Sequence, residues 1–203
     1  MAKRTRSVLL LPMIIVVGLV AVFGVSKVVD FVKDITGASD AVVFGEGDAV
    51  IMVSADAEST VETCQATIIQ DKRCGDLHVL FVDAARMPFI ARNTQLAWES
   101  GHPAVLTMNR AKQQANRAAA CPRSFPKPHG GSCDEYPMAS TEQGGKGARA
   151  EEVPVRENTC QGGSYGWQYP KDGDNFLVVI LRPDLIASGP FTGADIAKQQ
   201  GTC

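Results

Sequence analysis

The most informative stretch of this 203-residue sequence is Cys133-Asp134-Glu135-Tyr136-Pro137-Met138-Ala139-Ser140-Thr141-Glu142-Gln143-Gly144-Gly145. It places three carboxylates, those of Asp134, Glu135 and Glu142, around a rigid Tyr-Pro step. The two glycines at its end carry no side chain, so a phosphate can approach the backbone there. Because hard divalent cations prefer oxygen ligands, the stretch predicts a divalent-metal site.

A cluster of this kind suits the cleavage of a phosphodiester. That reaction needs a cation on the non-bridging oxygens, a base that activates water and a group that stabilises the leaving oxyanion. The carboxylates can supply the first two roles, and Arg117 and Lys146 are the nearest candidates for phosphate contacts. Taken alone, these residues also fit a simpler interpretation, in which Asp134-Glu135 is an exposed turn and Glu142 is a helix cap.

The net charge of -2 is unevenly distributed along the chain. Residues 86–149 hold nine basic and four acidic side chains, whereas residues 41–85 hold two basic and eight acidic ones. Residues 150–203 are again acidic, with four basic and seven acidic side chains. A polyanion would therefore bind the middle segment, although such a block is often only a solvated face. Its coincidence with the carboxylate cluster favours a phosphate-containing partner.

From about residue 87 to residue 181 the chain resembles the NucA/NucB deoxyribonucleases, which are secreted bacterial proteins. The strongest block is residues 133–139 with Glu142 and residues 144–148. Weaker support comes from Pro88, Ala97, Gly101, Leu106-Thr107 and Asn116-Arg117, and from Glu157-Asn158, Gly162-Gly163, Asp174 and Phe176. The resemblance implies a metal-dependent, extracellular endonuclease with little sequence specificity and a small ββα-metal-like core.

The resemblance also assigns roles to individual residues. It implies that Asp134 is a general base or metal partner, that Glu135 and Glu142 are site carboxylates and that Asn158 is a metal ligand. The expected ion is Mg²⁺ or Mn²⁺. Arg117 is expected to act in catalysis and in DNA binding.

Asn116 and Lys146 complete the residues expected to contact DNA. One departure is Ser132-Cys133, where some members of the family have Asp-Arg; if that Asp is essential, activity is weakened or lost.

The N-terminus predicts export. Lys3, Arg4 and Arg6 precede an uncharged, almost wholly apolar run at residues 8–25, which is typical of a membrane-seeking helix. The run is longer than an ordinary signal-peptide core and shorter than a full bilayer span, and no small-x-small cleavage site follows it. We expect an uncleaved anchor rather than a cleaved signal peptide. In both cases residues from about 40 onward face the outside.

Six cysteines fit an oxidising compartment: Cys64, Cys74, Cys121, Cys133, Cys160 and Cys203. Proximity along the chain favours pairing Cys64 with Cys74 and Cys121 with Cys133, which leaves Cys160 for Cys203. A zinc site built from Cys121, His129 and Cys133 is the alternative. Its ligand spacing is irregular, so structural disulfides are favoured.

The pattern as a whole predicts one disulfide-stapled α+β domain at residues 41–203, after a signal or anchor helix and linker at residues 1–40. We expect a hairpin from residues 42–44 and 50–53, strands at 66–69, 78–82, 105–107 and 176–181, helices at 89–100 and 111–120, and loops at 122–132 and 161–169.

Two other functions remain compatible with the sequence. A catalytically inactive, membrane-tethered DNA-binding module would keep the basic middle segment and lose turnover. A disulfide-stapled structural protein of the cell envelope would need neither DNA nor metal. Both DNA and RNA remain possible substrates. An inhibitor protein is a further possible partner, because an active nuclease threatens its host, but no residue identifies one.

Overall fold

The computed structural model describes residues 41–46 and 49–200. The predicted anchor helix and Cys203 lie outside these residues. Within the described part, no helix has both the length and the apolar character needed to cross a bilayer.

A mixed sheet forms the larger part of the core. Its strands follow the order β1-β2-β8-β4-β3, and β5 also pairs with β8. Along one edge β8 pairs with β4 in the parallel direction. Along its other edge it pairs antiparallel, first with β5 and then with β2. The strands are β1 (Ala41–Phe44), β2 (Ile51–Ser54), β3 (Arg73–Cys74), β4 (Leu77–Asp83), β5 (Val105–Thr107) and β8 (Asn175–Leu181).

β8 is central because its sequence is apolar on both faces. Residues 176–180 are fully buried, as expected of a strand covered on both sides. This confirms the strand predicted at 176–181 and, with β4 and β5, those predicted at 78–82 and 105–107. The predicted N-terminal hairpin is also present, because β1 and β2 pair antiparallel.

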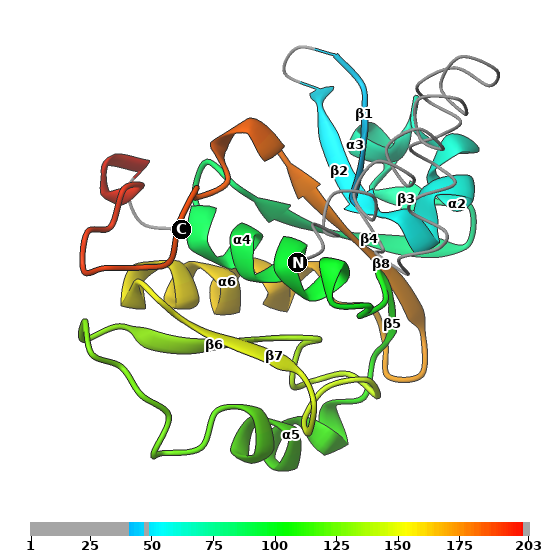
Figure 1. Ribbon diagram of the computed structural model, residues 1–203. Helices are drawn as coiled ribbons and strands as arrows, with labels where there is room; N and C mark the ends of the chain where they lie inside the picture. Colours follow the sequence, from blue (N-terminus) through cyan, green and yellow to red (C-terminus); the bar gives the residue numbers. More distant parts are fainter. Residues whose placement is uncertain (1–40, 47–48, 201–203) are drawn as a thin grey trace, which may run out of the picture. The chain divides into compact units, whose positions relative to one another are not determined.

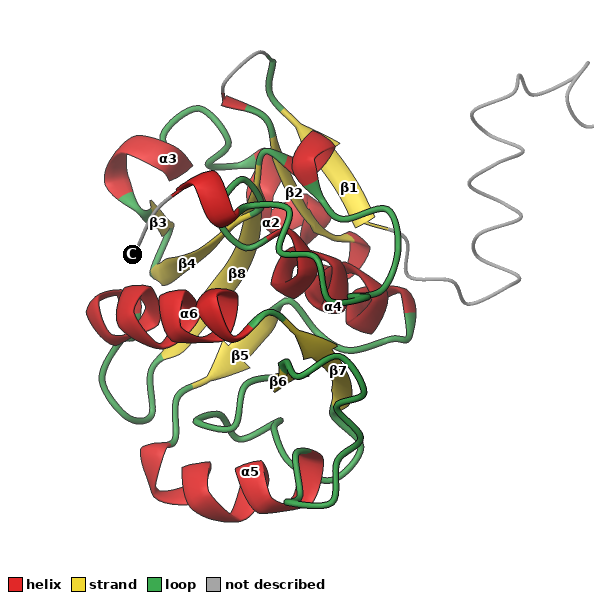
Figure 2. Ribbon diagram, turned by 90° about the vertical axis from the view of Figure 1, so that its left-hand side faces the viewer, coloured by secondary structure: helices red, strands yellow, loops and turns green. Residues whose placement is uncertain are grey.

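Two helices separate this sheet from a second, smaller one. Figures 1 and 2 show α4 (Pro88–Glu99) and α6 (Val155–Gln168) between the main sheet and the antiparallel pair β6 (Ser132–Tyr136) and β7 (Arg149–Val153). α5 (Gln113–Ala120) lies beyond β6 and β7. The shorter elements are η2 (Ala55–Ala57), α2 (Glu58–Glu62), α3 (Ile68–Asp71), η3 (Arg110–Lys112), η4 (Pro183–Leu185) and η5 (Lys198–Gln200).

The two predicted helices are confirmed. α4 begins at Pro88, where a missing N–H costs nothing, and its chain then turns at Gly101, which has a positive φ of 86°. Trp98 of α4 donates a hydrogen bond of 2.9 Å to the Tyr136 hydroxyl, which fastens β6 to this helix. The helix predicted at 111–120 is formed by η3 and α5 together.

Both disulfides favoured by proximity are present. Cys64 is bonded to Cys74, and Cys121 is bonded to Cys133. Cys160 is disulfide-bonded too, but its predicted partner lies outside the described residues. The zinc alternative is wrong, because the sulfurs of Cys121 and Cys133 are bonded to each other and the His129 ring packs on Phe191, 6.1 Å away.

Two expectations about local structure are wrong. Residues 66–69 are not a strand: Ile68 begins α3 and its N–H bonds the Cys64 carbonyl at 2.9 Å, inside the loop that the Cys64–Cys74 disulfide closes. Residues 161–169 are not a loop either, because α6 continues to Gln168. Buried Cys160 and Tyr165 hold this helix against the core, and tertiary packing outweighs the low helix propensity of its glycines.

The fold is therefore a mixed α+β domain with two disulfides between described cysteines.

Candidate functional site

One cavity of about 460 Å³ collects most of the charged and amide side chains predicted to act. Its walls come mainly from β6, α5, η3 and α6, which are separated along the chain. The side chains that matter for the argument are Arg110, Arg117, Asp134, Glu135, Asn158 and Gln161.

Asp134 lies on β6, and only 1% of its surface is exposed. The simpler interpretation of Asp134-Glu135 as an exposed turn is therefore wrong, since both residues lie in a buried strand. Asn93 of α4 donates a hydrogen bond of 2.9 Å to Asp134 Oδ2 and another of 3.3 Å to the Asp134 carbonyl. Burial raises the pKa of Asp134, while Asn93, Gln161 and the charge of Arg117 oppose that rise.

Glu135 is the next residue of β6 and forms an ion pair with Arg117 of α5. The Arg117 guanidinium also donates to the Cys133 carbonyl at 2.8 Å, so α5 is fastened to the strand. Burial raises the pKa of Glu135 to about 7 against the opposing charge of Arg117. The Arg117 side chain is 42% exposed and lines the cavity, so it can meet a ligand there while it remains paired with Glu135.

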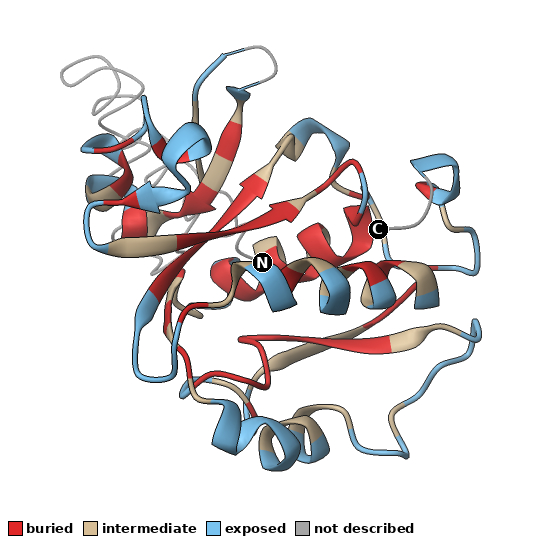
Figure 3. Cartoon of the chain, turned by 180° about the vertical axis from the view of Figure 1, so that it is seen from behind, coloured by how far each residue is buried: buried red, intermediate tan, exposed pale blue. Residues whose placement is uncertain are grey.

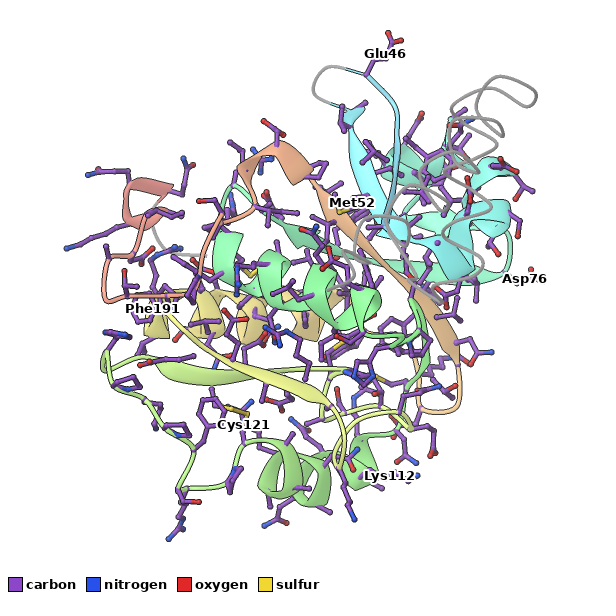
Figure 4. All side chains as sticks on the ribbon, in the orientation of Figure 1. Glu46, Met52, Asp76, Lys112, Cys121 and Phe191 are labelled. Carbon is purple, nitrogen blue, oxygen red and sulfur yellow. A yellow bond between two sulfur atoms is a disulfide. The ribbon has the colours of Figure 1, made fainter. Side chains whose placement is uncertain are left out.

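The Cys121–Cys133 disulfide lies directly beside this pair of carboxylates. Cys121 Sγ lies 3.0 Å from Glu135 Oε2, and Figure 4 shows Cys121 between α5 and the smaller sheet. Figure 3 shows β6 mostly buried and α5 mostly exposed. The bond thus joins an exposed helix to the buried strand that carries the site.

Asn158 lies on α6, just before the residues predicted as a loop. Its Nδ2 donates to Ser132 Oγ at 2.6 Å and to the Cys133 carbonyl at 3.3 Å. The amide nitrogen is therefore engaged, and the amide oxygen is the end left for a ligand. The Ser132 hydroxyl thus orients this amide.

Glu142 does not line the cavity. It is 40% exposed, forms an ion pair with Lys112 and accepts a hydrogen bond from Asn109. The hydrogen bond from Lys112 is the main cause that lowers the pKa of Glu142. Its assignment as a metal ligand stays a prediction.

Asn116 has a structural role. Its Nδ2 donates to the carbonyls of Ala139 and Thr141, both at 2.9 Å. A Cβ on Gly145 would lie 2.5 Å from Asn116 Oδ1, and one on Gly144 would lie 2.3 Å from the Met138 carbonyl. These two glycines are therefore required by contacts within the protein, and the DNA contact expected of Asn116 stays a prediction.

Lys146, the third residue expected to contact DNA, is exposed and lies outside the lining of the cavity.

The sequence interpretation missed Asn93, Gln161 and Arg110. Asn93 carried a usable signal, since it is a polar residue one turn from Ile90 and next to Thr94 on the side of the predicted helix that faces the core. Gln161 was assigned to a loop, so its position facing Asp134 could not be inferred. Arg110 reaches the cavity only through the 3-10 turn η3.

The fold and this cavity define a mixed α+β protein with a buried acidic site flanked by arginines. Residues 90–179, somewhat under half of the chain, match the family model described as deoxyribonuclease NucA/NucB. The chain therefore carries a NucA/NucB-type nuclease domain, and the resemblance found in the sequence is confirmed. All six cavity side chains named above lie within the matched residues. No curated protein matches the chain.

Proposed function

We propose that this protein is a metal-dependent endonuclease that hydrolyses the phosphodiester bonds of DNA with little sequence specificity. The observation that carries the proposal is the pair of buried carboxylates on β6, Asp134 and Glu135, which share a cavity with Arg117 inside the segment that matches the NucA/NucB family. The order of β6, β7 and α6 along the chain is also that of a ββα-metal core, which we propose this unit to be.

The donor set of the cavity fits a hard divalent cation such as Mg²⁺ or Mn²⁺. Among the described residues, the one cluster of three acidic, His or Cys ligand atoms is Cys121, Cys133 and Glu135, and the disulfide removes its two sulfurs. What remains is the Glu135 carboxylate and the free oxygen of Asn158. Few protein ligands, with water and substrate phosphate completing the shell, are typical of Mg²⁺. When bound, the ion would offset the negative charge of the phosphate and act as a Lewis acid.

Asp134 is the proposed general base. Its carboxylate is fixed by the Asn93 amide on one side, and the Gln161 side chain interacts with it from α6. A carboxyl group with a raised pKa is a stronger base than an exposed one, so Asp134 can take the proton of the attacking water.

Arg117 would contact the phosphate oxygens and stabilise the charge that develops on them. Its ion pair with Glu135 holds the guanidinium at the rim of the cavity in advance.

We further propose that the protein acts outside the cell. The disulfides are compatible with an extracellular location, because such bonds persist in oxidising compartments. Export through the apolar N-terminal run, with retention of the domain on the outer face of the membrane, extends this proposal from the sequence.

The test is incubation of the purified protein with supercoiled plasmid DNA in Mg²⁺ or Mn²⁺, with and without chelator. We expect nicking and then degradation, which the chelator stops and added metal restores. Cleavage that continues undiminished in excess chelator would exclude the metal mechanism. Salt-dependent binding to plasmid without any cleavage would instead support an inactive DNA-binding module.

A further inference from the structure

Helix α6 contains three glycines in its second half, Gly162, Gly163 and Gly166. Glycine is among the poorest helix formers, so three of them in one helix call for a reason. Gly162 and Gly166 line the cavity that holds Asp134 and Glu135, whereas Gly163 does not.

Nothing within the described protein requires glycine at these positions. A Cβ built on Gly162, Gly163 or Gly166 would meet no atom within 4 Å. None of the three has a positive φ, so the backbone also accepts other residues. At Gly144 and Gly145, by contrast, a Cβ would collide with other atoms of the protein. The bare surface at Gly162 and Gly166 faces open space in the cavity.

A second observation points to a ligand at the same wall. Tyr165 lies between the two glycines, lines the cavity and is 2% exposed. Its hydroxyl makes no hydrogen bond of ordinary geometry among the described residues, although the Gln161 side chain lies nearby. A buried hydroxyl without an acceptor is costly, so the hydrogen bonding of this wall is incomplete.

We propose that the face of α6 formed by Gly162, Tyr165 and Gly166 seats one strand of the DNA substrate, with its sugar–phosphate backbone against the bare helix. This inference rests on the proposed function and names the surface on which that substrate lies. Glycine permits such close approach of a ligand because no Cβ intervenes. The Tyr165 hydroxyl has less than 1 Å² of exposed surface beside Gln161, so it donates to the bound strand once one of these two side chains turns towards the cavity.

The dimensions of this face suit a polymer. From Gly162 to its end at Gln168 the helix advances about 9 Å at about 1.5 Å per residue, or roughly three base-pair rises of about 3.4 Å. Arg110 lies at the Tyr169 end, with its guanidinium carbon 6.0 Å from the centre of that ring. It lines the same cavity, its side chain is 44% exposed and it forms an ion pair of 2.7 Å with Asp172, so a neighbouring phosphate would share its charge with that carboxylate.

The glycines provide their own matched control. Gly162→Ala, Gly166→Ala and Gly163→Ala should each raise the midpoint of urea unfolding, because alanine is a better helix former and its Cβ meets nothing. Only the variants at 162 and 166 should lose cleavage of plasmid and of a short single-stranded oligonucleotide. Glutamine at 162 or 166 should cost on the order of 10²-fold in kcat/KM through displacement of the substrate, whereas Gly163→Gln should stay near the wild type.

Tyr165→Phe keeps the ring and its edge-to-face contact with Tyr169, whose centre is 5.7 Å away, and removes only the hydroxyl. We expect about a tenfold loss of kcat/KM on DNA, the usual scale for a hydrogen bond to a charged group, without loss of stability.

The outcomes separate this inference from the proposed function. A wild-type protein that cleaves no DNA would reject the function itself. A wild type that cleaves, together with folded variants at 162 and 166 that cleave equally well, would overturn the inference. So would an equal loss in Gly163→Gln, because the effect would then not belong to one face. If the glutamine variants do not fold, the alanine pair decides in the same way.

Discussion

Asp134 combines deep burial with a position at the cavity, and at the scale of single residues this is the least expected result. A buried carboxylate needs hydrogen-bond donors to remain useful, and Asn93 provides the clearest one from another helix. The sequence identified Asp134 by resemblance. The sequence places Asn93 on the core side of its helix, and only the packing of α4 against β6 makes it the partner of Asp134.

The first prediction concerns this carboxylate. Asp134→Asn keeps the size of the side chain but cannot take a proton from water, so turnover should fall on the order of 10²-fold or more. DNA binding should persist, since the phosphate contacts remain. Turnover on plasmid and filter binding would be measured after circular dichroism shows a folded protein. Near-normal turnover of the folded variant would move the proposed base elsewhere, with Glu135 as the next residue to test.

The second prediction concerns Arg117. Arg117→Ala should weaken both turnover and binding, because the guanidinium would meet phosphate in the ground state and in the transition state. It should also reduce the slope of the logarithm of the binding constant against the logarithm of the salt concentration by about one, the share of one phosphate contact. Arg123→Ala removes the same charge from the exposed loop after α5 and serves as the control. Equal effects of the two substitutions would show that only general charge matters.

At the scale of elements, the loop between α5 and β6 connects an exposed helix to the buried strand with the carboxylates. The Cys121–Cys133 disulfide closes this loop, with a sequence separation of 12. The Cys64–Cys74 disulfide closes a loop of nearly equal size, with a separation of 10, at α3 and β3. None of its residues lines the cavity.

The third prediction uses this pair of loops. Replacing both cysteines of either disulfide by serine should lower the free energy of unfolding by about 3 kcal/mol in the chain-entropy model, as measured by urea unfolding. Cleavage should fall only in the Cys121/Cys133 variant, assayed at a temperature where both variants remain folded. A nuclease activity that survives intact in that variant would show that β6 holds its carboxylates without the covalent bond.

At the scale of the whole molecule, the layer formed by α4 and α6 determines how the two sheets are joined. Glu157 of α6 is fully buried and accepts hydrogen bonds from the N–H groups of Phe89 and Ile90, at 3.0 and 3.2 Å. It therefore caps the first turn of α4 from the neighbouring helix. Burial raises the pKa of Glu157 to about 8, against those two hydrogen bonds and the charge of Arg156.

The fourth prediction follows from this carboxyl group. Its pKa in the folded protein lies above the ordinary value of 4.5 for a glutamate, so folding favours the protonated form. The stabilisation is complete below about pH 4.5 and is lost as pH rises towards 8, by up to about 1.4 kcal/mol per pH unit. Glu157→Gln should make the slope shallower by the share of this one group, since Glu135 and Asp134 also have raised pKa values, and urea unfolding of both proteins at several pH values would show it. Parallel curves for the two proteins would contradict the assignment.

The sequence by itself determined the elements whose signals are local. The apolar run of β8, the proline and glycine that bound α4, and the short disulfide loops were all predicted correctly, because each depends on neighbours along the chain. The block around Asp134 and Glu135 also sufficed to predict the NucA/NucB resemblance, since a long motif carries its own specificity.

Only the tertiary structure decided which of these residues meet. It extended α6 through glycines that argue against a helix, and so brought Asn158 and Gln161 to the cavity with Asp134. It also placed Glu142 on Lys112 and Asn116 beside the Gly144-Gly145 turn, both outside the lining of the cavity, and their predicted roles stay predictions. The physical reason is that burial of the core, summed over the packed layers, outweighs local propensity, and contacts between distant segments leave no periodic pattern in the chain.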